Sequence, residues 1–337
     1  MVRCAAAAAL FGATTPLASR LADDTSAPML AGLLYLGAAL AVVPFARRRF
    51  DRLAARRGAA RLGLAVLAGG FLGPLLLTSG LSRTPAATAS LLLNLELVAT
   101  TLLAAFLFRE HLGGRVIAGA AAVVTAGVVL VWTDAPDLRL GGVLIVGACV
   151  CWGLDNCVTA ELDEFSPAHI TLAKGAIAGS TNVVLGLLLG DRMPTAGLVL
   201  AALALGAIGY GASITLWVTG ARDLGAARGQ LVFSAAPFVG VLVAWLVLRD
   251  PVRPAEAAAV LIAAFGVSRV LGSQHEHAHQ HRPIEHDHEH DHHDGHHEHL
   301  HVADDGTTRH AHPHRHEALI HAHPHVPDVH HRHDHDS

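Results

Sequence analysis

Apolar and polar positions follow one another in long blocks along the first 271 residues, and ten of these blocks are apolar. Most are about 18–23 residues long, the length with which an α-helix crosses ~30 Å of hydrocarbon. A water-soluble protein of this size would not expose, or find room to bury, so many helices that are apolar on every face. The pattern therefore predicts an all-α polytopic membrane protein with ten transmembrane helices, and we do not expect an enzyme. The blocks fall at about 4–19, 28–46, 62–82, 86–108, 113–132, 140–160, 167–189, 196–219, 229–248 and 254–271.

The ten segments form two matching halves of five. Three pairs of stretches match: 80–110 with 220–250, which align without gaps, Arg109-Glu110 with Arg249-Asp250, and Phe11-Gly12 with Trp152-Gly153. Because the offset between partners is nearly constant, the matches indicate an internal repeat. An odd number of spans per half makes the second half start from the opposite side of the membrane, which predicts an inverted repeat with a site near the midplane.

These patterns divide the chain into three parts: a first five-helix repeat at 1–133, a second at 140–271, and a histidine-rich tail at 272–337. The first apolar segment also has the basic start and apolar run of a signal peptide. Its counterpart in the second half favours a helix that is kept.

Arginines set the expected orientation. The loop at 47–61 carries seven of them, and loops rich in Lys and Arg face the cytoplasm. With ten spans, both termini are then cytoplasmic, and the chain is integral to the cell membrane.

The stretches CWGLDNCVTAEL from Cys151 and GARDLGAARGQLVFSAAPFVG from Gly220, together with the paired motifs above, resemble the drug/metabolite transporter superfamily, EamA type. The resemblance covers about 1–271. It implies a secondary transporter of a small solute, and family members carry metabolites, amino acids, drugs or nucleotide sugars. The family often has a proline midway along each fourth helix. Pro237 keeps it, whereas Leu97 stands there in the first half, beside Glu96.

Three ionisable side chains lie well inside the apolar segments: Glu96, Asp155 and Lys174. Each costs roughly 3 kcal/mol or more at a helix centre unless it faces the bundle interior and finds a partner. Lys174 is the only lysine of the chain, and a lysine can lose its proton when desolvated, whereas an arginine cannot. Two acids against one base leave one carboxylate to take up a proton or a cation. We expect all three to face one polar cavity between the halves; the alternative is a structural ion pair that ties the halves together.

Asn156, Asn94 and Ser234 are further candidates for the cavity. Asn156 follows Asp155 on the same segment, and Asn94 and Ser234 occupy equivalent positions in the two halves. These side chains either line the route or only hydrogen-bond between helices.

The tail holds 24 of the 26 histidines and interleaves them with Asp, Glu and Pro. It has no helical period and few large apolar residues, which predicts disorder. Imidazole suits Zn, Cu and Ni, so we expect the tail to bind Zn, Ni, Co or Cu, although no cofactor is required. The alternative is a pH-sensitive polyampholyte. The expected metal ligands are His275, His277, His279, His281, His286, His288, His290, His292, His293, His296, His297, His299 and His301.

Three functional hypotheses follow. The first is a gradient-driven or exchange transporter of a small solute whose tail links transport to metal. In the second the cargo is a transition-metal ion (Ni, Zn or Co), with the tail as a collecting arm. The third is a membrane-anchored metal sensor or store without transport. The expected partners are the lipid bilayer and a small-molecule or metal cargo, not nucleic acid, and a homodimer is left open.

Overall fold

The computed structural model describes residues 1–46, 52–108, 112–132, 136–159, 162, 165–224, 232–271, 275–280, 284–291, 309–316 and 320–325. The chain divides into two compact units, Met1–Ser273 and Gln274–Ser337. The first unit is helical and the second contains the tail.

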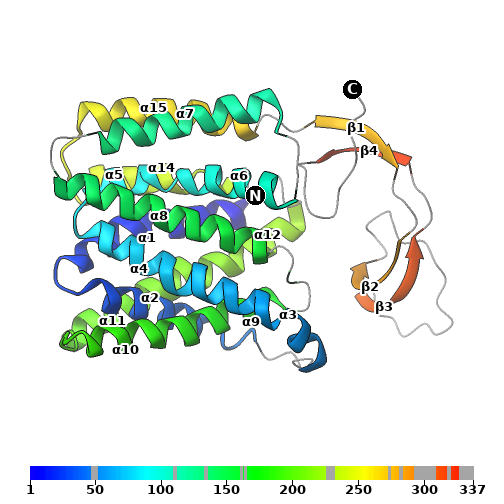
Figure 1. Cartoon of the computed structure of the whole chain (residues 1–337), viewed down its shortest axis with the longest axis horizontal. Helices are drawn as coiled ribbons and strands as arrows, with labels where there is room; N and C mark the ends of the chain where they lie inside the picture. Colours follow the sequence, from blue (N-terminus) through cyan, green and yellow to red (C-terminus); the bar gives the residue numbers. More distant parts are fainter. Residues whose placement is uncertain are drawn as a thin grey trace. The chain divides into compact units, whose positions relative to one another are not determined.

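Helices occupy each of the ten predicted apolar segments (Figure 1). The first half contains α1 (Val2–Ala22), α2 (Ala27–Val42), α3 (Arg52–Ala65) with η1 (Val66–Leu72) and α4 (Gly73–Leu81), α5 (Ala86–Leu92) with α6 (Leu95–Phe108), and α7 (Gly114–Val131). The second half contains α8 (Pro136–Thr159), α9 (Pro167–Ala173) with η2 (Lys174–Ala178) and α10 (Gly179–Leu188), α11 (Ala196–Gly206) with η3 (Ala207–Ala212) and α12 (Ser213–Leu224), α14 (Ala236–Leu242) with η4 (Val243–Val247), and α15 (Pro254–Leu271).

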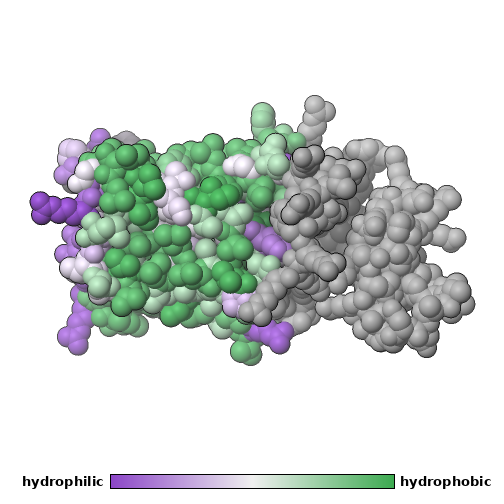
Figure 2. All heavy atoms as spheres, turned by 90° about the horizontal axis from the view of Figure 1, so that it is seen from below, coloured by the Kyte–Doolittle hydropathy of each residue, from purple (hydrophilic) through white to green (hydrophobic). Residues whose placement is uncertain are grey.

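The helical unit has the surface of a membrane protein. Large apolar side chains such as Phe106, Leu188 and Leu261 are 73–82% exposed, and Figure 2 shows an almost continuous hydrophobic band along its side. Two helices, Ala27–Val42 and Ala236–Val247, are apolar but shorter than a usual span. The unit is thus all-α and polytopic, while the number of ten spans stays a prediction. Within the described residues, six runs are long and apolar enough to cross a bilayer: Gly58–Leu81, Ala86–Leu107, Gly114–Val131, Pro136–Thr159, Pro167–Leu188 and Ala196–Trp217.

Equivalent helices of the two halves pack against each other in opposite directions. The fifth helices, α7 and α15, lie side by side (Figure 1). Gly119 packs against Gly266 and Val270, whereas Val123, one turn further along α7, packs against Gly266. Residue numbers rise on one helix as they fall on the other, so the pair is antiparallel.

The second helices show the same relation, because Gly32 packs against Val183 of α10 and Gly175 of η2 packs against Ala39 of α2. Two equivalent helices that cross antiparallel require an axis perpendicular to their length. Such an axis relates the halves as an inverted repeat.

The first helix of each half packs on the third and fourth helices of the other half. Helix α1 contacts α12 and α14, and α8 contacts α4 and α6. Gly12 lies against Ala236, and Gly153 lies against Ala99 and Thr100. Small residues allow this close backbone approach in lipid, so the halves interleave.

The fourth helices are interrupted, which differs from the continuous helices predicted at 86–108 and 229–248. A turn separates α5 from α6, where the N–H of Asn94 donates to the Leu91 carbonyl at 3.1 Å. An equivalent turn precedes α14, where the N–H of Ala235 donates to the Val232 carbonyl at 3.3 Å. These bonds span three residues and tighten the chain. In the second half Pro237, which has no N–H, explains why the ladder weakens.

Four short segments of the tail are strands in the structure, and the disorder of the tail as a whole stays a prediction. Strands β1 and β4 pair antiparallel, as do β2 and β3. Alternation of His with other residues has a period of two, which is the period of a strand, and this explains the extended backbone. The strands are β1 (His275–Gln280), β2 (Ile284–Asp291), β3 (Arg309–His316) and β4 (Ile320–His325).

The structure describes some of the predicted metal ligands of the tail and not others. His275, His277, His279, His286, His288 and His290 lie on β1 and β2. Seven lie outside the described residues: His281, His292, His293, His296, His297, His299 and His301. Among the residues whose side chains are described, no group of three His, Cys, Asp or Glu is placed to hold a metal ion.

Candidate transport site

Lys174 is carried by a helix whose start is capped by a serine. Ser166 is the N-cap, its hydroxyl accepts a hydrogen bond from the His169 N–H at 3.3 Å, and Pro167 takes the first turn. Lys174 begins η2, a π-helical turn. Such turns are rare and occur often at functional sites.

Asp155 on α8 forms an ion pair with Lys174. The Lys174 Nζ lies 2.6 Å from Asp155 Oδ1 and 2.7 Å from Oδ2, and the two side chains are only 15% and 10% exposed. Thr159, one turn along α8, donates to Asp155 Oδ1 at 3.0 Å. Lys174 also donates to the Thr159 hydroxyl at 3.4 Å. Both charges of the pair therefore have partners.

The pair lies within the second half, because α8 and η2 both belong to it. It does not join the two halves, as the structural alternative required. The first half contributes Gly69 of η1, which packs directly against the Asp155 carboxyl group. A residue with a Cβ at this position would displace the acid.

Glu96 lies at the start of α6, directly after the turn that interrupts the fourth helix. Its Oε1 accepts a hydrogen bond from Asn156 Nδ2 at 3.0 Å. Asn156 also donates to the Thr100 hydroxyl at 3.2 Å. This contact joins α6 of the first half to α8 of the second, so it is made between the halves.

Asp155 and Asn156 are consecutive on α8, so the Asp155–Lys174 ion pair lies next to the Asn156–Glu96 hydrogen bond. Gly69, which packs against the Asp155 carboxyl group, also links this site to Tyr35. Tyr35 donates to the Gly69 carbonyl at 2.7 Å, and the indole N–H of Trp152 donates to the same carbonyl at 3.1 Å. We call Glu96, Asp155, Asn156, Lys174 and Tyr35 the midspan cluster.

Asn94 and Ser234 lie at the interruptions of the fourth helices. The Asn94 amide donates to the Leu91 carbonyl at 3.0 Å within its own turn, and the side chain is buried. Ser234 lies in the turn before α14. For Asn94, the structure gives no hydrogen bond to the midspan cluster among the contacts it describes.

Sequence reasoning missed an aromatic cluster near this site. The rings of Phe11 and Tyr210 are 5.7 Å apart and those of Tyr35 and Tyr210 are 5.6 Å apart. Phe233 continues the series, 5.4 Å from Phe11 and 6.1 Å from Trp217. These residues come from four separate helices, and nothing in their local sequence indicates that they meet.

The fold and the cluster define a polytopic membrane protein built as an inverted repeat with charged residues in mid-span. The sequence matches the EamA-like transporter family over residues 2–133 and 139–272. The chain belongs to that family, and the two matched stretches correspond to the two halves.

The chain is also similar to two further proteins. A protein described as an uncharacterized transporter, from Methanothermobacter thermautotrophicus, is 26% identical over 213 residues, which is 60% of this chain and 62% of that protein. A solved crystal structure shares the fold with a TM-score of 0.56 and 22% identity, over 79% of this chain and 96% of its own. Both names that carry a function describe transporters rather than enzymes.

Proposed function

We propose that the protein is a secondary transporter that moves a small organic solute across the cell membrane, with both termini in the cytoplasm. The observation that carries this proposal is the midspan cluster, in which a buried ion pair lies next to a carboxylate held across the two halves. Binding near the midplane, followed by rocking of one repeat against the other, is how inverted-repeat carriers work.

In this proposal Glu96 is the coupling residue. Its hydrogen-bond donor is the neutral amide of Asn156, whereas Asp155 has the cation Lys174. Glu96 is thus the acid left to take up a proton or a cation. Hydrogen bonds to an ionised carboxylate are stronger than those to a neutral group. Protonation of Glu96 would weaken its bond to Asn156 and loosen the contact between the halves.

Glu96→Gln tests this role. We expect the variant to lose transport driven by a pH gradient while exchange of solute on the two sides persists, since the amide cannot change charge. Asp137→Asn, an acid in the first turn of α8, is the control and should leave coupling unchanged. Gradient-driven uptake into vesicles at the wild-type rate in Glu96→Gln would contradict the role.

The cargo can be found by growth. Cells that express the protein are compared with cells that express Asp155→Asn, across a panel of toxic metabolites and metal salts. A difference limited to organic compounds supports the proposal. A difference limited to Ni, Zn or Co supports the second candidate, and no difference at all supports a sensor or store.

The second candidate is metal cargo with the tail as its collecting arm. One observation favours it: strand pairing places His275 opposite His325 and His277 opposite His323 on β1 and β4. Residues directly opposite in an antiparallel pair are close neighbours on one face. In either case we propose that the tail binds Zn, Ni, Co or Cu.

A further inference from the structure

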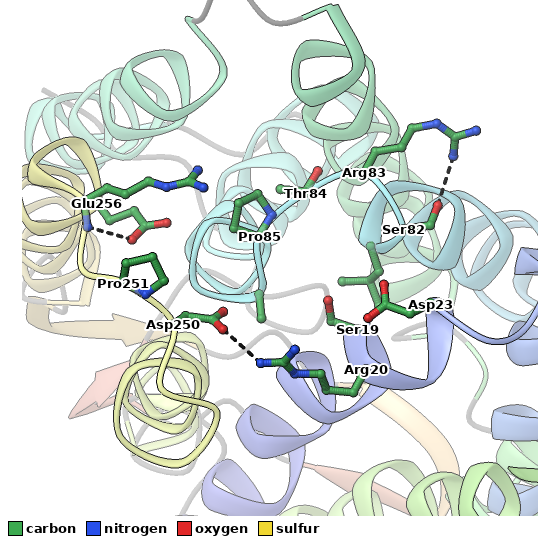
Figure 3. Close-up of a pocket in the computed structure, with 13 residues that line it drawn as sticks. Ser19, Arg20, Asp23, Ser82, Arg83, Thr84, Pro85, Asp250, Pro251 and Glu256 are labelled. Atoms are coloured by element: carbon green, nitrogen blue, oxygen red, sulfur yellow. Dashed lines mark hydrogen bonds and ion pairs between the residues drawn. The ribbon is translucent and has the colours of Figure 1, made fainter.

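A second charged feature lies outside the midspan cluster. A cavity of about 360 Å³ lies where α1 ends, where α4 gives way to α5, and where α15 begins (Figure 3). None of the midspan residues lines it. Its charged lining side chains are Arg20, Asp23, Arg83, Asp250, Arg253 and Glu256.

Glu256 has a structural role in this cavity. It is 2% exposed, and its Oε1 accepts from the Thr88 hydroxyl at 2.7 Å. Its Oε2 accepts from the Arg253 backbone N–H at 3.2 Å and from the Trp245 indole at 3.4 Å. A Glu near the start of a helix that accepts from the preceding backbone N–H closes half of a capping box. Its oxygens are therefore already occupied.

Arg83 is also engaged. Its guanidinium donates to the Ser79 carbonyl and to the Ser82 hydroxyl. Figure 3 shows this guanidinium directed toward Ser82 and away from Arg20. Arg83 therefore already has hydrogen-bond partners next to it in the chain.

Arg20 already holds a carboxylate in this cavity. The Arg20 Nη2 atom lies 3.2 Å from Asp250 Oδ1, and the side chains of Arg20 and Asp250 are 53% and 21% exposed. Arg20 Nη2 also donates to the Leu248 carbonyl at 3.2 Å. Arg249 has a left-handed backbone, with φ of 58°, which turns the chain between Leu248 and Asp250. This conformation is disfavoured for a residue with a Cβ, and here it places the carboxylate on Arg20.

We propose that this cavity binds a small anion with a carboxylate or phosphate group through Arg20 and Arg253, and that Asp250 occupies Arg20 when no anion is bound. In the part of the chain that the structure describes, no ion pair is assigned to Arg253. An exposed pair such as Arg20–Asp250 contributes little, so an incoming anion displaces Asp250 easily. The cavity volume lies within the range of about 300–1,000 Å³ that small-molecule sites have.

Replacement of Asp250 by an anion on Arg20 would change how the two halves of the bundle are held together. Arg20 ends α1 of the first half, and Asp250 follows η4 of the second. Anion binding would release this tie between them. This anion site is separate from the proposed transport site, and a binding test on it does not depend on transport.

The test is calorimetry on the full-length protein in detergent, with succinate and inorganic phosphate as separate probes. We expect a Kd on the order of 1 mM for at least one probe. Arg253→Gln should weaken binding about tenfold or more, since it removes a charged hydrogen-bond donor. Asp250→Asn should tighten binding roughly two- to fivefold, because it removes the competing carboxylate.

Arg192→Gln is the matched control, because Arg192 is exposed on the loop before α11 and does not line the cavity. Its affinity should equal that of the unmodified protein. Binding of one probe alone supports the proposal and identifies the anionic group. Absence of heat with both probes, or equal weakening by Arg192→Gln and Arg253→Gln, would overturn the site. Unchanged or weaker binding in Asp250→Asn would overturn the exchange.

Discussion

At the scale of single residues, the Asp155–Lys174 ion pair neutralises two opposite charges inside the helix bundle. Removing one partner leaves the other charge buried and uncompensated, which costs about 3–5 kcal/mol. We expect Asp155→Asn to abolish transport and to lower thermal stability in detergent strongly. Asp155→Asn combined with Lys174→Met removes both charges and should be the more stable of the two variants, although equally inactive.

Thermal unfolding of the single and double variants, followed by fluorescence-detected size exclusion, checks this order. A single variant that is as stable as the double variant would show that water or a neighbouring group compensates the remaining charge. Transport by either variant would remove the pair from the mechanism.

How much of the site the sequence predicts depends on the kind of residue. Glu96, Asp155 and Lys174 stand out because a charge inside an apolar segment is costly wherever it points. Asn156 could be nominated only as the neighbour of Asp155, and its bond to Glu96 depends on how two distant helices pack. Tyr35 and Phe11 could not be nominated at all, because an aromatic residue in a span is ordinary packing material.

At the scale of elements, glycines set how closely the helices approach. Gly206 on α11 packs directly against the backbone of Leu34 on α2, whereas Gly197 on the same helix has open space around its Cα. Gly206→Ala should push the two helices apart and cost about 1–3 kcal/mol, as overpacking does. Gly197→Ala should be neutral or slightly stabilising, since alanine is the better helix former.

The two alanine variants differ from the natural sequence by one methyl group on one helix, so a melting temperature in the same detergent compares them directly. Equal melting temperatures would mean that the α2–α11 contact adjusts at no cost. The expected order would instead confirm that this interface fixes the arrangement of the halves.

The helix interruptions show where sequence reasoning ends at this scale. Pro237, which has no backbone N–H, predicts a weakened ladder of helical hydrogen bonds before α14. No comparable residue precedes α6. The turn at Asn94 could be inferred only by carrying the second half onto the first through the repeat. The π-helical turns η1 and η3 fall at corresponding points of the third helices, and apolar periodicity does not distinguish such turns from regular helix.

At the scale of the whole molecule, orientation is the next prediction. The arginines at 47–61 predict that this loop and both termini lie in the cytoplasm, and that the loop before α11 lies outside. In a variant without its four native cysteines, Arg192→Cys should react with a membrane-impermeant maleimide on intact cells. A cysteine added after Ser337 should react only after lysis, and the reverse pattern would invert the topology.

The last prediction concerns the histidine-rich tail and its effect on transport. Met1–Ser273 is a compact unit without it, so deleting 274–337 should leave a folded, inserted transporter with residual activity and an altered response to metal. Full-length protein should bind several Zn or Ni ions per chain, less tightly below about pH 6 as the imidazoles protonate. Replacing all 24 tail histidines with Asn keeps the length and should reproduce the deletion. Calorimetry measures the binding and vesicle transport measures the response. Loss of all transport in both variants at normal expression would make the tail a required delivery arm and favour metal as the cargo.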